Sequence, residues 1–264
     1  MTAMERRNGS RSFKLLTSLG PVAFLSFLVL LWQIAIGHRP DQLLPGPWGV
    51  VRAFRELLQH GLIFKYVVAS LFRVTWGFAL AAVLGIPAGL FIGWNRRAGM
   101  ALNPLVEVLR PISPLAWIPI AILWFGVGDL AAIFLIFLGC FFPLLVTAMN
   151  AVRSIPAIYV NAGRNFGLGP AALITRVLLP AVMPQLIVGM RITLGVGWLV
   201  VVAAEMIAVN SGLGFLIVDA RNAGNRYDLV VAGMVTIGLI GLLLDLGMRS
   251  LQQVNSLRWS YSED

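Results

Sequence analysis

Charged residues are scarce in this chain of 264 residues. Aspartate, glutamate, lysine and arginine make up 12% of it, whereas hydrophobic residues make up 59% and the mean hydropathy is +0.87. Because soluble domains carry about 25% charged residues, this composition excludes an ordinary soluble domain and predicts an all-α polytopic membrane protein. The length leaves little room for a second domain, so we expect residues 1–264 to form a single transmembrane domain.

Cysteine, histidine and lysine are also rare. The single cysteine, Cys140, excludes an intrachain disulfide. The two histidines, His38 and His60, lie outside the apolar runs and belong to no His-Glu-x-x-His pattern, so we expect no catalytic residue and no metal site. The basic residues are dispersed between apolar runs, which argues against nucleic-acid binding and for cytoplasmic loops beside anionic membrane lipid.

Apolar runs long enough to cross about 30 Å of hydrocarbon predict six membrane spans, with five as the alternative. The run at 15–36 is too long for a signal peptide and ends in Gly-His-Arg-Pro, so we interpret it as a retained span. Arg110, Pro111 and Pro114 interrupt another run, which should therefore be kinked and face inward. The expected spans are about 15–36, 66–94, 104–127, 130–152, 185–209 and 229–248.

The distribution of basic residues predicts the orientation. With the N-terminus inside, eleven basic residues lie on the cytoplasmic side and six outside. Both termini should then be cytoplasmic, with a tail at 1–14. Residues 40–64 lie outside and carry an amphipathic helix from Trp48 to Leu62. Residues 210–228 form a second outer connection, partly re-entrant.

Three glycines four residues apart, Gly85, Gly89 and Gly93, share one face of the span at 66–94. Small residues at this spacing let two helices approach closely in lipid. The pattern is typical of packing between helices of one chain, and a subunit interface is the alternative.

The polar interruption at 153–184 is long for a simple connection. Pro156 can open a helix to about Phe166, Gly167-Leu168-Gly169 can end it in a turn, and Pro170 can open a second helix that ends before Pro180. The pattern predicts two short helices standing off the cytoplasmic face. An amphipathic loop lying on the membrane is the alternative.

The spacing in this segment resembles the EAA loop of binding-protein-dependent ABC importer permeases. The matching residues are Asn161-Ala162-Gly163, then Gly167, then Val177-Leu178-Leu179-Pro180. Over roughly residues 40–250 the chain resembles the branch of this family that transports nitrate, sulfonate, taurine and bicarbonate. The stretches that carry this resemblance are Arg110–Gly126, Gly189–Ile192, Gly197-Trp198 and Val202–Glu205. Asn161 and Gly163 depart from the usual glutamate and second alanine, so a contact made by that glutamate is not carried over.

The resemblance implies a type I ABC importer permease in a bacterial inner membrane. Two such chains would join two ATPase subunits and an extracytoplasmic substrate-binding protein. ATP and Mg²⁺ would act on the ATPase, which agrees with the lack of a Gly-x-x-x-x-Gly-Lys-[Ser/Thr] motif here. The residues that would couple to the ATPase are Asn161, Ala162, Gly163, Gly167, Leu179 and Pro180.

Glu205 lies deep in an apolar run, where an unpaired charge costs about 2.5–3.5 kcal/mol. It should therefore lie near the outer end of the span, form an ion pair with Arg73 or Arg110, or line a pathway; Arg191, on the same helix, is too far away for a direct bond. Arginines facing a cavity suit oxyanions, and Arg110 is the first choice; an arginine that snorkels or lies near the cytoplasmic face is the alternative. The candidates for a translocation pathway or gate are Arg110, Ser113, Trp117, Arg191 and Glu205.

Two other functions compete with an ATP-driven importer of a small oxyanion. A secondary transporter or channel would often show internal repeats, and none is evident. An intramembrane enzyme lacks its usual motifs. The run Trp124–Gly128 is closer to the sulfonate and taurine members, but the sequence leaves the cargo open among the anions of the branch.

Overall fold

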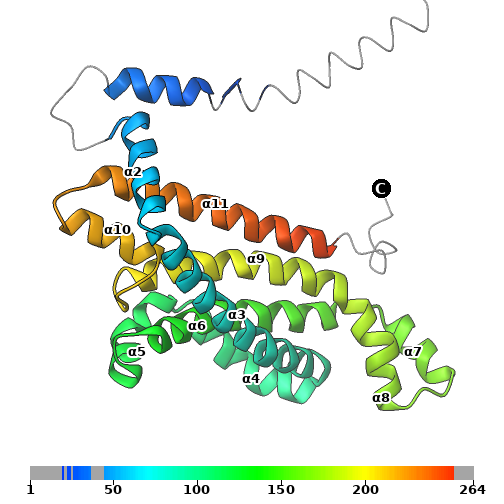
Figure 1. The fold of residues 1–264 in the computed structure, drawn as a ribbon. Coiled ribbons are helices and arrows are strands. Elements are labelled where there is room, and N and C mark those ends of the chain that lie inside the picture. The colour runs from blue at the N-terminus through cyan, green and yellow to red at the C-terminus, as the bar shows by residue number, and fades with distance from the viewer. Residues whose placement is uncertain (1–19, 21–22, 25, 37–44, 253–264) are drawn as a thin grey trace, which may run out of the picture.

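The structure is a computed structural model that describes residues 20, 23–24, 26–36 and 45–252. Within these ranges it is helical and contains no strand (Figure 1). From Pro47 onward its elements are α2 (Pro47–Gln59), α3 (Leu62–Trp94), α4 (Arg96–Leu109), a 3₁₀ turn (Pro114–Trp117), α5 (Ile118–Phe125), α6 (Asp129–Arg153), α7 (Ala157–Asn165), α8 (Pro170–Leu173), a π turn (Ile174–Leu178), α9 (Leu179–Glu205), α10 (Leu213–Asn222) and α11 (Tyr227–Gln252).

The described residues hold four helices long and apolar enough to cross a membrane. A fifth crossing is formed if α4 and the helix Pro114–Phe125, which meet at a bend of 82°, make one broken span. The bend confirms the kink predicted at Arg110–Pro114. Of the predicted span at 15–36 the structure describes residues 20, 23–24 and 26–36, and Ser26–Ile36 is an apolar helix. The tail at 1–14 falls outside the described residues. The four long helices are Leu62–Trp94, Asp129–Arg153, Pro170–Glu205 and Tyr227–Ser250.

Helices α3 and α6 form the centre of the bundle and run parallel. Four glycines of α3 lie over backbone carbonyls of α6 at a constant offset along the chain: Gly77 over Ile133, Gly85 over Phe141, Gly89 over Leu145 and Gly93 over Met149. A Cβ on Gly85 would lie only 3.1 Å from the Phe141 oxygen. The glycine pattern therefore serves packing within the chain, the first of the two predicted uses.

Helix α9 crosses the bundle in the opposite direction, between α6 and α11 (Figure 1). Gly189 lies against Thr147, and Gly197, about two turns further along α9, lies against Cys140. On its outer side, the Trp198 indole donates to the Ile237 carbonyl at 3.1 Å. This pairing of α9 with both neighbours buries the residues around Trp198 in the main apolar core.

The amphipathic helix predicted from Trp48 to Leu62 is present as α2. It turns Val50, Ala53 and Leu57 inward. Arg226, just before α11, reaches Glu56 of α2 at 2.7 Å and Asp228 at 2.9 Å. Hydrogen bonds to these two carboxylates raise the pKa of Arg226 above its usual value. The ion pairs tie α2 to the start of α11.

The predicted end of the second loop helix before Pro180 is wrong. α8 continues through the π turn into α9, so that Pro170–Glu205 is one helix of 36 residues. In the π turn the Leu179 N–H donates to the Ile174 carbonyl, five residues back. Pro180 then falls in the first turn of α9, and the widened turn before it accommodates a residue that has no N–H to donate.

Candidate functional site

The segment 153–184 projects from one end of the bundle as α7, a tight turn and α8 (Figure 1). The turn is a Schellman motif, in which Leu168 N–H donates to Gly163 O at 3.1 Å and Gly167 N–H donates to Arg164 O at 2.9 Å. Gly167 has φ +76°, a left-handed conformation that favours glycine. The predicted two-helix geometry, with a stop at Gly167, is therefore present, although its second helix is the start of a longer one.

Gly163 is the residue that lets α7 lie on the helix that follows. It is buried, and a Cβ in its place would lie 2.8 Å from Leu173 Cδ1. Glycine is thus suited to the position where the resembled loop usually has alanine. We refer to α7, its turn and α8 as the knuckle.

A cavity of about 620 Å³ lies where the knuckle meets α9. Its lining includes Tyr159, Ala162, Phe166, Arg176 and Pro180. The knuckle also exposes large apolar side chains, with 88% of Phe166, 71% of Ile158 and 60% of Tyr159 accessible. A hollow bordered by exposed aromatic groups is suited to receiving another protein surface.

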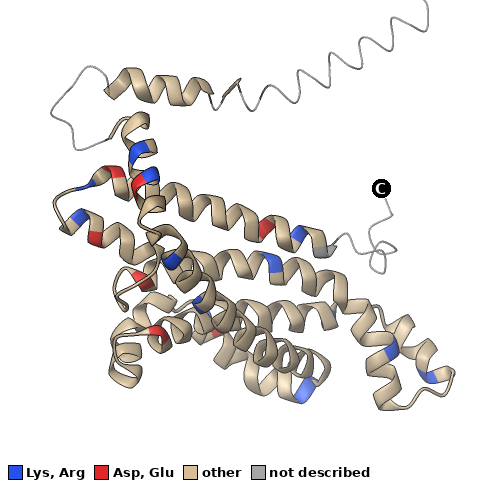
Figure 2. Ribbon diagram, in the orientation of Figure 1, with Lys and Arg blue, Asp and Glu red and all other residues tan. Residues whose placement is uncertain are grey.

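The charged residues of the segment 153–184 are all basic. Residues 153–184 contain arginines and no aspartate or glutamate, and Figure 2 shows the α7–α8 end with blue and no red segments. Asn161 and Ala162 are exposed, Leu179 is half-buried and Pro180 is exposed. The coupling residues predicted from the sequence are thus gathered on and beside the knuckle.

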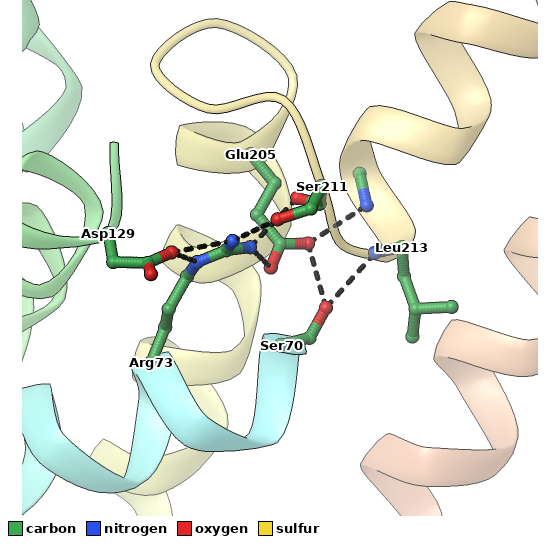
Figure 3. A network of polar contacts seen from close by, with 7 residues as sticks. Ser70, Arg73, Asp129, Glu205, Ser211 and Leu213 are labelled. Carbon is green, nitrogen blue, oxygen red and sulfur yellow. Dashed lines mark hydrogen bonds and ion pairs between the residues drawn. The ribbon is translucent and has the colours of Figure 1, made fainter. Parts of the chain in front are cut away.

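A second polar group lies at the opposite end of α9, centred on Glu205 (Figure 3). Its carboxylate is fully buried and accepts hydrogen bonds from Arg73 Nη1 at 2.6 Å, from Ser70 Oγ at 2.8 Å and from Gly214 N at 3.0 Å. Arg73 was one of the two predicted partners. Arg110, the other, is exposed at the end of α4 and takes no part in these contacts.

Arg73 is 2% exposed and has a partner for each of its five guanidinium N–H groups. Nε and Nη2 contact Asp129 Oδ1, each at 2.7 Å. Nη1 donates to the Ser211 carbonyl at 2.8 Å as well as to Glu205, and Nη2 also donates to the Ser211 hydroxyl. One guanidinium therefore links α3, the start of α6, the end of α9 and the connection to α10.

The other pathway candidates lie elsewhere. Arg191 pairs with Asp245 of α11 at 2.5 Å and is half-buried. Ser113 caps the 3₁₀ turn by accepting from Leu115 N at 3.3 Å, and Trp117 packs against the main core. The predicted pathway residues thus occupy three separate places: the bend, the contact of α9 with α11, and the buried network.

Sequence reasoning missed Ser70, Asp129 and Ser211. Asp129 carried the clearest signal, because it opens the span at 130–152 directly after Gly128 and matches the sign needed beside Arg73. The two serines carried none, since a hydroxyl in a helix or loop is common and its partners lie more than 130 residues away along the chain.

Comparison with known proteins agrees with this architecture. Residues 85–260 match the family described as the binding-protein-dependent transport system inner membrane component. The chain is 38% identical to the bicarbonate transport system permease protein of Synechococcus elongatus, covering 96% of this chain and 98% of the relative. It is 34% identical to the taurine transport system permease protein of Escherichia coli K12, covering 89% and 87%.

A solved structure shows the same fold. A chain of the MetNI methionine ABC transporter, in an inward-facing conformation, superposes with a TM-score of 0.64 at 20% identity, covering 73% of this chain and 95% of that one. The predicted type I ABC importer permease fold is therefore confirmed.

The chain belongs to the family of inner-membrane components of binding-protein-dependent transport systems. It is the multi-pass permease subunit of an ABC importer. ATP and Mg²⁺ act on a separate ATPase in such systems, and the substrate is delivered by a binding protein.

Proposed function

We propose that the knuckle is the surface through which this permease couples to its ATPase subunits. Asn161, Ala162, Gly163 and Gly167 build or present the projecting part, and Leu179 and Pro180 form its root. The observation that carries the proposal is the exposed aromatic rim beside the 620 Å³ cavity. Since α8 and α9 are one helix, a displacement of the knuckle would be transmitted along α9 to Glu205.

The assembly that follows has two copies of this chain in the bacterial inner membrane, surrounded by lipid, with two ATPase subunits on the knuckle side. That side would be cytoplasmic, together with both termini and the tail at 1–14. Residues 40–64 and the end carrying Glu205 would then face outward, toward the binding protein. All of residues 1–264 would form a single transmembrane permease domain.

The cargo we propose is a small oxyanion, and the bend between α4 and α5 is its place of passage. Pro114, at the bend, lies beside Gly139, since a Cβ on Gly139 would be 3.3 Å from Pro114 Cγ. Gly139 is near the middle of α6, so the bend lies near the middle of the membrane. Arg110 is exposed beside this bend. An arginine at that depth is costly against lipid and favourable beside an aqueous pathway.

Ser113 and Trp117 border the same bend. Arg191 and Glu205 would act through the position of α9.

The test of coupling is a pair of matched substitutions in the full-length chain. Phe166→Ser removes an exposed aromatic group from the knuckle, and Phe64→Ser removes one that is 76% exposed at the opposite end of the bundle. We expect Phe166→Ser to reduce co-purification of the ATPase at least tenfold, as loss of a central interface aromatic does. Phe64→Ser should leave it unchanged. Equal effects of the two changes would refute the proposal.

A further inference from the structure

A second cavity, of about 410 Å³, lies where α3 passes into α4 beside the end of α6. Its polar lining comes from Arg96, Asn103 and Arg153, and its apolar lining includes Trp94 and Met100. It is separate from the cavity at the knuckle, with which it shares none of these residues. Neither the coupling surface nor the bend between α4 and α5 accounts for it.

The cavity carries positive charge without a compensating carboxylate. The ion pairs among the described residues engage Arg73, Arg191, Arg226 and Arg249, and none engages Arg96 or Arg153. No aspartate or glutamate lines the cavity. Arg153 Nη2 donates to Asn103 Oδ1 at 3.3 Å, which holds one edge of the guanidinium. Two arginines at one hollow are suited to phosphate oxygens.

Glycine makes room for this arrangement. A Cβ at Gly99 would lie 3.0 Å from Arg153 Nη2, so a larger residue there would displace the guanidinium. Gly99 is buried on α4 and lines the cavity. The close approach of Arg153 to α4 therefore depends on the absence of a side chain at this position.

The depth of the cavity matches a lipid headgroup. Helix α3 rises about 32 Å between Arg73 and Trp94, and α6 rises about 36 Å between Asp129 and Arg153. These rises are close to the hydrocarbon thickness of about 30 Å, and neither stretch contains a charged residue between its ends. Trp94 is 40% exposed, as is typical of tryptophan at the boundary between hydrocarbon and headgroups.

We propose that this cavity binds the phosphate of an anionic glycerophospholipid such as phosphatidylglycerol. Arg96 and Arg153 contact the phosphate oxygens, and Trp94 and Met100 contact the glycerol and the first part of an acyl chain. The apolar lining and the interfacial depth favour a lipid over a soluble phosphate. The inference requires only that the chain spans a membrane, so it stands or falls independently of the coupling surface.

The test is native mass spectrometry of the full-length chain titrated with phosphatidylglycerol or with phosphatidylcholine. Each arginine near an anionic headgroup contributes about fivefold in affinity, so Arg96→Gln combined with Arg153→Gln should weaken phosphatidylglycerol binding about 25-fold. Phosphatidylcholine, in which the choline balances the phosphate charge, should bind the wild type more weakly and lose less affinity on the same substitution. Arg97→Gln is the matched control, because Arg97 is an exposed neighbour that does not line the cavity.

Replacing both arginines by lysine keeps the charge and should keep most of the binding, which separates loss of the site from loss of folding. A large excess of inorganic phosphate should not compete. The proposal is overturned if the double glutamine variant binds phosphatidylglycerol as the wild type does, if Arg97→Gln weakens binding equally, or if inorganic phosphate displaces the lipid. If the double glutamine variant lost a co-purifying protein subunit but still bound phosphatidylglycerol, the cavity would be a protein interface, and the proposal would also be overturned.

Discussion

Arg73 Nη1 donates to Glu205 Oε1 at 2.6 Å, joining two buried side chains that are 132 residues apart in the chain. The pair closes the end of the bundle opposite the knuckle. Because the helix Pro170–Glu205 runs from the knuckle to Glu205, this contact lies at its far end. Its loss should therefore be visible in stability and in coupling.

Glu205→Ala leaves Arg73 buried with Asp129 as its one remaining carboxylate. Removing one partner of a buried pair costs about 3–5 kcal/mol, and we expect the melting temperature of the chain to fall by about 10 °C. Glu205→Gln, which retains an acceptor for Ser70 and Gly214, should lose less. Glu107→Ala is the control, since Glu107 is exposed on α4. Melting curves in detergent that coincide for Glu205→Ala and Glu107→Ala would contradict the buried role.

The parallel packing of α3 on α6 predicts a difference between two glycines. A Cβ at Gly89 would collide with the Leu145 carbonyl, whereas a Cβ at Gly238 on α11 meets no atom within 4 Å. Gly89→Ala should destabilise the chain by about 1–3 kcal/mol through overpacking, and Gly238→Ala should be neutral or stabilising. Chemical denaturation in mixed micelles measures both; a neutral Gly89→Ala would show that α3 and α6 can separate without cost.

Much of this fold could be predicted from the sequence, and the reasons are local. Apolar runs predicted α3, α6, α9 and α11, and helical spacing of Val50, Leu57 and their neighbours predicted α2. The helix stop and turn at Gly167 followed from glycine and proline placement, and the structure shows that the turn is a Schellman motif. These features depend on residues within a few turns of one another.

What could not be predicted depends on distant partners or on the register of backbone hydrogen bonds. Arg73 and Arg110 were equal candidates for Glu205, because nothing in either neighbourhood specifies which span lies beside α9. The continuity of α8 with α9 rests on a π turn ahead of Pro180. Proline after an ordinary turn ends a helix more often than it continues one, so the sequence pointed to a break.

Gly167 and Gly169 test whether the shape of the knuckle matters for coupling. Gly167 has φ +76°, where a β-branched residue is strained by about 1–3 kcal/mol; Gly169 has φ −66°, which any residue adopts. Gly167→Val should lower ATPase co-purification several-fold, and Gly169→Ala should not. Comparable yields from both variants would mean that the turn does not set the docking surface.

Arg110 tests the pathway. Arg110→Gln should reduce anion uptake into proteoliposomes about tenfold or more while ATPase co-purification stays at the wild-type level, because the bend is remote from the knuckle. Arg52→Gln, at an exposed position on α2, is the matched control. Full uptake by Arg110→Gln would remove Arg110 from the pathway without affecting the coupling proposal.

The most direct test of the account is cross-linking from the knuckle in membranes. With Cys140→Ala removing the one native thiol, Asn165→Cys places a reactive group at the exposed end of α7 while Phe166 is kept, and Trp48→Cys places one on α2 at the opposite end. A short bifunctional reagent should join the Asn165→Cys chain to the ATPase subunit, and the yield of this product should change when ATP is added, while Trp48→Cys gives no such product. Cross-linking to the ATPase from position 48 and not from position 165 would contradict the account.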